Sequence, residues 1–361
     1  MRRRSIVFAC LLGGLAADAQ AAPRGNAGHG STWGDSSVLP RTRSPAVVGQ
    51  SRDGRKSDAA RSTSSWTRAT LRTPFPDGRR RVPRTQVPAP FGDQLIPGEK
   101  FRFDINFAGN PAGLAEAEIV AGEPDPRGRG PQGAPTLQIL GSARTSGVVS
   151  MLATVTDEIV SVIDARTGAP VHSVNTLHYD GFAPKYRHRV TDQQYEGRGQ
   201  VRIVDTKDEK VKRKLKTVPV DTFDPMSAMA WVRTLPFEPG TRYKAHVVDG
   251  STLMRVEIEA TGRGAPAHLP SITRALELGP DDIVQLKGKL TRVDAHDQPI
   301  PGKKAFALRA WVSADARRIP LVLESDMWVG SIRLQLSAYD PPPRPEPEAP
   351  PAPADPSTPQ P

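Results

Sequence analysis

The sequence predicts a mainly β domain between residues 91 and 340, either an antiparallel β-sandwich or a partly open β-barrel with one packed helix. Short runs in which apolar and polar residues alternate recur through this region, and this period of two is typical of half-buried strands. Turn residues separate the runs at short intervals with no helices interleaved, which favours antiparallel pairing. Only the segment 225–235 has the apolar spacing of a helix.

The predicted strands begin at 101–107, which places four apolar side chains on one face: Phe101, Phe103, Ile105 and Phe107. Further strands are expected at 114–120, 136–143, 151–163, 171–180, 185–195, 200–205 and 210–218. A hairpin follows at 243–256, and its Asp249-Gly250 pair suits the positive φ angles of a type I′ turn. The last strands are expected at 283–293, 305–313, 320–327 and 330–339.

The predicted helix at 225–235 has clear end signals. Asp224 can cap it, Pro225 suits the first helical position and Pro236 ends it. Its apolar stripe should pack on the sheet or fill the mouth of a barrel: Ala228, Trp231, Val232 and Leu235. Met226 and Met229 lie on a neighbouring face. With Trp231 they are candidates for lining a cavity or forming a lid, and a plainly packed core helix is the alternative.

The first 21 residues have the pattern of an export signal peptide. Three arginines precede an apolar run from Ile6 to Ala17, and Ala19-Gln20-Ala21 offers small residues for cleavage. That run is too short to span a bilayer, so no transmembrane segment is expected after signal removal. Cys10 lies inside the run, and because apolar residues continue past it we do not expect a lipoprotein. The mature chain then has no cysteine, which excludes disulfides and cysteine catalysis.

The positive charge of the chain is concentrated in a predicted disordered leader at 22–90. The net charge is +10, and this leader holds thirteen Lys or Arg against four Asp. The β domain is therefore close to neutral, which argues against a nucleic-acid-binding fold. The leader is either a solvated spacer or a tether to an anionic surface. A proline-rich tail at 341–361, in which eleven residues are Pro, is expected to be disordered as well.

One expected strand carries a row of lysines. Four of them share a face, with Val211 and Leu215 opposite: Lys210, Lys212, Lys214 and Lys216. Charged side chains on an edge strand discourage aggregation, which is the structural interpretation. The functional alternative is a patch for an anionic ligand such as a lipid or an acidic polysaccharide.

Three segments stand out by their motifs: Pro97-Gly98-Glu99 before an aromatic strand, the run from Asp224 to Arg233, and the run from Trp311 to Leu321 followed by Gly330. Together they resemble a known bacterial family, the domain of unknown function DUF3108. The first segment is similar to the opening of the family, the second to its central helix and the third to its closing hairpins. The resemblance covers roughly 95–340 and implies an exported, β-rich fold. It supplies no catalytic residue, and the leader and tail lie outside it.

No motif for catalysis, cofactor binding or metal binding occurs in the sequence, so no residue is assigned to these roles. We expect a monomeric, non-enzymatic protein of the periplasm or outer membrane that binds a lipid-like or polysaccharide envelope component or an envelope protein. One alternative is an envelope hydrolase with an unidentified carboxylate site, and another is an assembly factor acting through its tails. An apolar cavity would favour the first, and perturbed carboxylates in a cleft would favour the second.

Overall fold

The computed structural model describes residues 95–123, 135–151, 153–181, 187–197, 199–327 and 330–342. The predicted signal peptide at 1–21, the basic leader at 22–90 and the tail from residue 343 onward lie outside the described residues.

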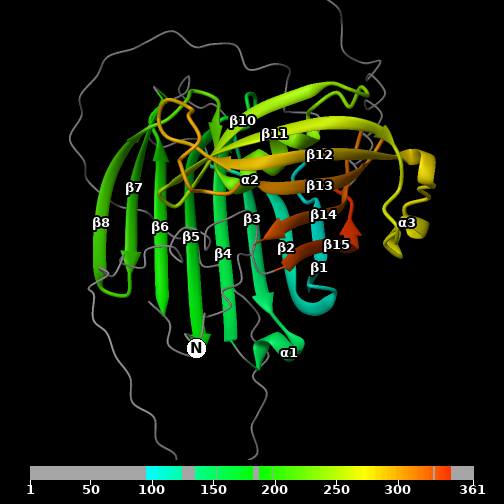
Figure 1. Ribbon diagram of the computed structural model, residues 1–361, viewed down its shortest axis with the longest axis horizontal. Coiled ribbons are helices and arrows are strands. Elements are labelled where there is room, and N and C mark those ends of the chain that lie inside the picture. Colours follow the sequence, from blue (N-terminus) through cyan, green and yellow to red (C-terminus); the bar gives the residue numbers. More distant parts are fainter. Residues whose placement is uncertain are drawn as a thin grey trace, which may run out of the picture. The chain divides into compact units, whose positions relative to one another are not determined.

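The strands form one antiparallel sheet of 15 members in the order β8-β7-β6-β5-β4-β3-β2-β1-β15-β14-β13-β12-β11-β10-β9 (Figure 1). The first half contains β1 (Lys100–Phe107), β2 (Asn110–Ala121), β3 (Thr136–Thr145), β4 (Ala153–Asp164), β5 (Pro170–Gly181), β6 (His188–Tyr195), β7 (Gln200–Lys207) and β8 (Lys210–Thr217). The second half contains β9 (Thr222–Phe223), β10 (Arg242–Asp249), β11 (Thr252–Arg263), β12 (Ile283–Arg292), β13 (Phe306–Ser313), β14 (Pro320–Met327) and β15 (Gly330–Asp340). Pairing of β1 with β15 joins the halves, and of the strands that the structure describes only β9 pairs in parallel, with β10.

The mainly β prediction is confirmed, and each predicted strand has a counterpart within a few residues. Of the two architectures considered, the sheet corresponds to the partly open barrel, since no strand among the described residues pairs with the outer edges of β8 and β9. The predicted helix is α2 (Pro225–Arg233). Three short elements and β9 had no counterpart in the prediction: α1 (Gly147–Ser150), α3 (Ile272–Ala275) and η2 (Pro280–Asp282). Among the described residues, no helix has the length and apolar character needed to cross a membrane.

The β10–β11 hairpin forms as predicted, but its turn is not type I′. Asp249 pairs with Thr252, so the two loop residues are Gly250 and Ser251. Gly250 has a φ of 55°, and Ser251 is not among the residues with positive φ. A positive φ at the first loop position alone is the pattern of a type II′ turn, where glycine is preferred.

The sheet curls on itself, so that the β10–β11 hairpin near one edge lies against the inner face of β6–β8 near the other edge. Val248 and Leu253, on the face of the hairpin turned away from α2, pack with inward residues of β6 and β7: Tyr195, Val201 and Ile203. The Gln193 side chain donates to the carbonyl oxygen of Gly250 at 3.0 Å, and Lys216 donates to that of Ser251 at 2.9 Å. The hairpin tip is therefore held within the curve of β5–β8 by side chains rather than by a strand ladder.

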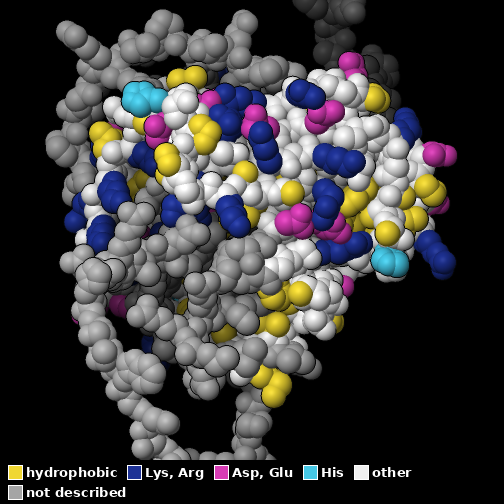
Figure 2. Space-filling model, viewed as in Figure 1, with side chains coloured by type: hydrophobic (Ala, Val, Ile, Leu, Met, Phe, Trp, Pro, Cys, Tyr) yellow, Lys and Arg dark blue, Asp and Glu magenta, His cyan; other side chains and the backbone are white. Residues whose placement is uncertain are grey.

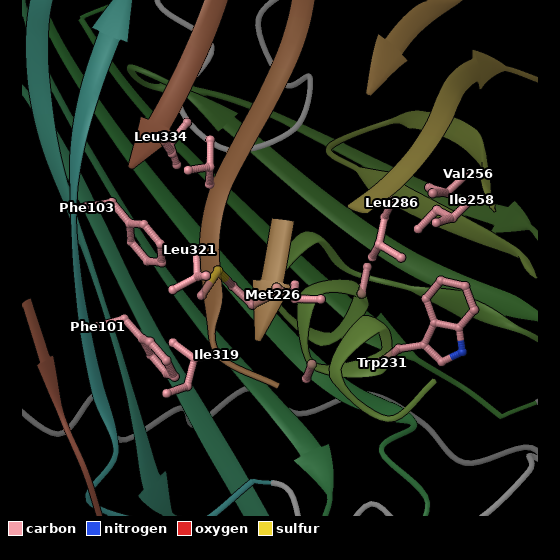
Figure 3. Close-up of a cluster of buried hydrophobic side chains, with 14 of the residues drawn as sticks. Phe101, Phe103, Met226, Trp231, Val256, Ile258, Leu286, Ile319, Leu321 and Leu334 are labelled. Carbon is pink, nitrogen blue, oxygen red and sulfur yellow. The ribbon is translucent and has the colours of Figure 1, made fainter. Parts of the chain in front are cut away.

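The main core lies between the rolled sheet and α2. The strand registers place alternate residues of each strand on this inner face, such as Phe103, Ala115 and Ala143 across β1, β2 and β3. In Figure 3, Phe101 and Phe103 point from β1 toward Met226, and Trp231 lies near Leu286 on the other side. The helix therefore contacts strands from both halves of the chain, as a packed central element.

Candidate functional site

An apolar cavity of about 120 Å³ lies beside α2 within the curve of the sheet. This is roughly ten times the space that one water molecule needs. Its walls come from β1–β3, β10–β15 and α2, and they include Phe103, Ile139, Val247, Val256, Leu290 and Leu334. Arg233 and Lys287 are the charged residues among those that line it. A cavity with so few polar groups suits a hydrocarbon chain better than a sugar or a nucleotide.

The start of α2 is fixed by a buried acidic cap. The Asp224 carboxylate accepts hydrogen bonds from the backbone N–H groups of Met226 and Ser227, at 2.9 and 3.2 Å. It also accepts from the hydroxyls of Ser161 on β4 and Ser227, each at 2.7 Å. Burial raises the pKa of Asp224, and these hydrogen bonds oppose that rise. The cap that the sequence predicts therefore also ties the helix to β4.

The end of α2 is held by a buried ion pair. The Arg233 guanidinium donates two hydrogen bonds to the Glu99 carboxylate, at 2.7 and 2.9 Å, and it lies over the Phe101 ring at 5.2 Å. The Tyr339 hydroxyl donates to the same carboxylate at 2.9 Å. Two-point pairing fixes both the position and the orientation of the guanidinium, so the end of α2 is anchored to Glu99 beside the cavity.

The predicted cavity residues Met226, Met229 and Trp231 all line this cavity. Met226 is fully buried, and a Cβ added at Gly141 of β3 would come within 3.1 Å of its sulfur. Trp231 stacks on Phe223 with ring centroids 5.7 Å apart, whereas Met229 is partly exposed. The two sequence interpretations therefore coincide: α2 is packed in the core and also forms one wall of the cavity.

The four predicted lysines lie on the edge strand β8, at positions that belong to the inner face of the sheet. In register they pair with inward residues of β7, as Lys214 does with Ile203 and Lys216 does with Val201. Lys210, Lys212 and Lys214 are exposed, and Lys and Arg side chains gather over β7 and β8 at the left of Figure 2. Their position on an open edge agrees with the structural interpretation and leaves their charges accessible to an anion.

A partly buried polar cluster, which the sequence did not predict, lies next to the apolar cavity on the inner face of the sheet. Asp157 on β4 accepts from the Asn175 amide of β5 at 2.7 Å, and Arg189 on β6 donates to Asp205 at 2.7 Å. Burial raises the pKa of Asp157 to about 6, while Asn175 and Arg189 oppose the rise. Burial and the nearby Asp157 charge raise the pKa of Asp249, at the end of β10, to about 7.

Arg292 completes this cluster from the end of β12. The residue is 7% exposed, and its Nε has no hydrogen-bond partner among the described residues. Burial lowers the pKa of Arg292, and the charge of Asp249 opposes this change. The cluster therefore combines two carboxyl groups with raised pKa values and a buried guanidinium that is incompletely satisfied.

A family model for proteins of unknown function, DUF3108, matches residues 102–337 of the sequence. The chain belongs to the DUF3108 family. No curated protein matches the sequence. A crystal structure described as a β-barrel-like protein of the domain of unknown function DUF1849, from Brucella abortus, is 13% identical with a TM-score of 0.46. The match covers 68% of this chain and 98% of that chain.

The polar cluster of the DUF3108 domain can be recognised in the sequence from the positions of its charged residues. Asp157 lies on the same face of its strand as the apolar residues Val155 and Ile159. Arg292 lies on the same face as Leu286 and Leu290. Each charged residue therefore occupies an inward position among apolar ones. For Asp249 the sequence predicts a turn residue, whereas the structure places it as the last residue of β10. Charged residues at inward parity are the feature that identifies this cluster.

Four histidines of the DUF3108 domain make local side-chain contacts. His172 on β5 lies 3.0 Å from the Asp192 carboxylate, and His178 stacks on His188 with centroids 4.5 Å apart. His246, on the outer face of β10, lies between Asp221 and Asp297, at 3.1 and 2.9 Å. Among the residues that the structure describes, no three candidate ligands come together as a metal site.

Proposed function

We propose that this DUF3108 protein is a non-enzymatic binding protein of the cell envelope whose rolled sheet holds the apolar chain of a lipid-like ligand. The apolar cavity beside α2 is the observation that carries this proposal. Proteins fill their cores at crystal-like density, so an apolar space that could hold several water molecules weakens the fold. Retaining it is reasonable where a ligand fills it.

The envelope location rests on the export signal pattern at residues 1–21. An exported protein with an apolar interior would shield a hydrocarbon chain from water in the periplasm or at the outer membrane. We propose that the protein acts as a monomer there, with the lysines of β8 facing anionic envelope components.

Binding of 1-decanol to the full chain tests this proposal, because decanol has an apolar chain and no charge. Isothermal titration should give saturable binding with a negative heat-capacity change, the mark of apolar burial. Ala310→Phe places a ring in the cavity wall and should weaken binding by about tenfold or more, since it occupies the space of several methylene groups.

Ala307→Phe is the matched control for this experiment. Ala307 lies on the same strand as Ala310, is exposed and does not line the cavity. Its affinity for decanol should equal that of the unmodified chain. Absence of saturable decanol binding, or equal effects of the two phenylalanines, would contradict the proposal.

The buried carboxyl groups favour a second candidate, a hydrolase that uses Asp157 and Asp249 as an acid–base pair. Carboxyl groups with pKa values of about 6 and about 7 could exchange protons near neutral pH. Hydrolysis of p-nitrophenyl decanoate that is lost in both Asp157→Asn and Asp249→Asn would support this candidate. We expect no hydrolysis above that of a protein-free blank.

A further inference from the structure

The polar cluster adjoins the apolar cavity along the same strands. Val247, Met254 and Arg292 are in register across β10, β11 and β12, and Val247 lines the cavity. Leu290, two residues before Arg292 on the same face, lines the cavity too. Two residues along a strand span about 7 Å. Arg292 therefore lies at the border of the cavity, where a chain occupying it would present its end group.

Arg292 is a buried cation with an incomplete set of partners. It is 7% exposed, and among the described residues its Nε has no hydrogen-bond acceptor. The charge of Asp249 acts on Arg292, but no ion pair between the two is present among the described residues. A buried charge without a paired counterion costs several kcal/mol, and proteins seldom retain one without a compensating contact. The flat guanidinium presents paired donors to a carboxylate or phosphate. An anion is the group that would satisfy it.

The two acids of the polar cluster determine how an anion could enter. Asp249 and Asp157 would repel it when charged, but burial already raises the pKa of Asp249 to about 7 and that of Asp157 to about 6. A second negative charge nearby raises such values further. An anion that binds beside Arg292 should therefore take up a proton, and its affinity should increase as the pH falls from 8 to 6.

A row of cations leads from the open edge of the sheet toward this cluster. Lys210, Lys207 and Arg189 are in register across β8, β7 and β6, and the row continues through Leu177 to Asp157. Arg189 lies so close to the hairpin tip that a Cβ at Gly250 would come within 2.7 Å of its terminal nitrogen. Asp205 pairs with Arg189 at 2.7 Å and lies 3.9 Å from Lys207, and the net positive charge that remains along the row attracts anions toward the interior.

We propose that Arg292 binds the anionic head group of a single-chain amphiphile whose hydrocarbon chain occupies the apolar cavity, an inference that rests on the proposed function. The shared chemistry is a carboxylate or phosphate at the end of an alkyl chain. The row of Lys210, Lys207 and Arg189 attracts the anion. Arg292 pairs with it, and the cavity walls around α2 surround the hydrocarbon chain.

Four probes of equal chain length test this site on the full chain: decanoate, decyl phosphate, decanol and decyltrimethylammonium. Decanoate or decyl phosphate should bind about tenfold more tightly than decanol at pH 7, the gain expected for a charge-assisted hydrogen bond. The ratio between these two anions distinguishes a fatty acid from a phosphate head group. The cation should bind more weakly than decanol.

Arg292→Gln should bring the affinity for the preferred anion down to that for decanol, and leave decanol within about twofold of the unmodified chain. Lys289→Gln is the matched control, because Lys289 is an exposed residue of β12 on the opposite face. Arg292→Lys retains a charge without the planar fork. Arg292→Lys should keep part of the preference for the anion over decanol. If Arg292→Gln does not fold, Arg292→Lys tests the role of Arg292 in its place.

The outcomes separate the two proposals. Decanol binding without a preference for either anion, or a preference that survives Arg292→Gln, would overturn the role of Arg292 and leave the cavity proposal standing. Failure of all four probes to bind would overturn both. Tighter anion binding at pH 6 than at pH 8, with decanol unchanged, would support the proton uptake at Asp249.

Discussion

The inner face of the sheet has two regions that differ in how they exclude water. Around α2, the strands β1–β3 and β10–β15 present apolar side chains and leave an unfilled cavity. On β4–β8 the same inner parity also carries polar residues between apolar ones: Asp157, Asn175, Arg189, Thr191, Gln193 and Asp205. The first region stabilises the fold by burial, and the second depends on satisfied hydrogen bonds.

This difference shows that the interior is amphipathic along its length. A domain that needed only a core could continue the apolar pattern through β4–β8, where aliphatic residues are already abundant. The chain instead buries ionisable groups beside an apolar cavity, at a cost in stability. Sites that bind ligands commonly carry such costs. Mutations in the two regions should therefore have opposite effects on stability.

Truncation of Trp231 should give the largest effect. Trp231→Ala removes a buried side chain that stacks on Phe223, so we expect the free energy of unfolding to fall by about 3–5 kcal/mol. Urea unfolding measures it. Leu215→Ala on β8, where the side chain is 59% exposed, should cost less than about 0.5 kcal/mol. A loss below about 1 kcal/mol for Trp231→Ala would show that α2 is a mobile lid rather than a packed wall.

Replacement of Arg292 should change stability in the opposite direction. Arg292→Met keeps much of the side-chain volume and removes a buried, incompletely paired charge, so unfolding should become harder by about 1–2 kcal/mol. The same urea titration in the absence of ligand measures it. Destabilisation by more than about 1 kcal/mol would mean that the fold itself depends on the guanidinium.

The pH dependence of stability should reveal the acids of the polar region. Asp249 and Asp157 have pKa values of about 7 and about 6 in the folded protein, against an ordinary value of 3.8. The folded state therefore binds these protons more tightly than the unfolded chain, and the free energy of unfolding should decrease as the pH rises from about 4 to about 7. Arg189 and Arg292 oppose this effect, since both favour the charged form of Asp249.

Asp249→Asn should flatten this decrease by roughly 2–3 kcal/mol between pH 5 and pH 8. Thermal or urea unfolding at the two pH values measures the difference. An unchanged slope in the variant would show that Asp249 is solvated in the folded protein and that the polar region is open to water.

The strands and the helix could be predicted from the sequence because their signals are local. Alternation along Phe101–Phe107 and the cap at Asp224 each act within a few residues. The rolling of the sheet could not be predicted in this way. It depends on the pairing of β1 with β15 and on the contact of Val248 with the β6–β7 layer, both between residues far apart in the chain.

The candidate site could be predicted only in part, because only some of its residues have a local signal in the sequence. Met226, Met229 and Trp231 were found because a helix places them on known faces. Asp157 and Arg292 were missed because a charged residue in an alternating run is normally assigned to the outer face, and the cost of burying it is decided by partners from other strands.

The dependence of affinity on chain length tests the central claim, that the apolar cavity holds a hydrocarbon chain, most directly. Titration of the full chain with primary alcohols of increasing length should give affinities that rise by about 0.8 kcal/mol per added methylene and then level off when the cavity is full. In Ala310→Phe the affinity should level off at a shorter alcohol. In Ala307→Phe it should level off at the same alcohol length as in the unmodified protein. Affinity that is independent of chain length, or a plateau that Ala310→Phe leaves in place, would contradict the account.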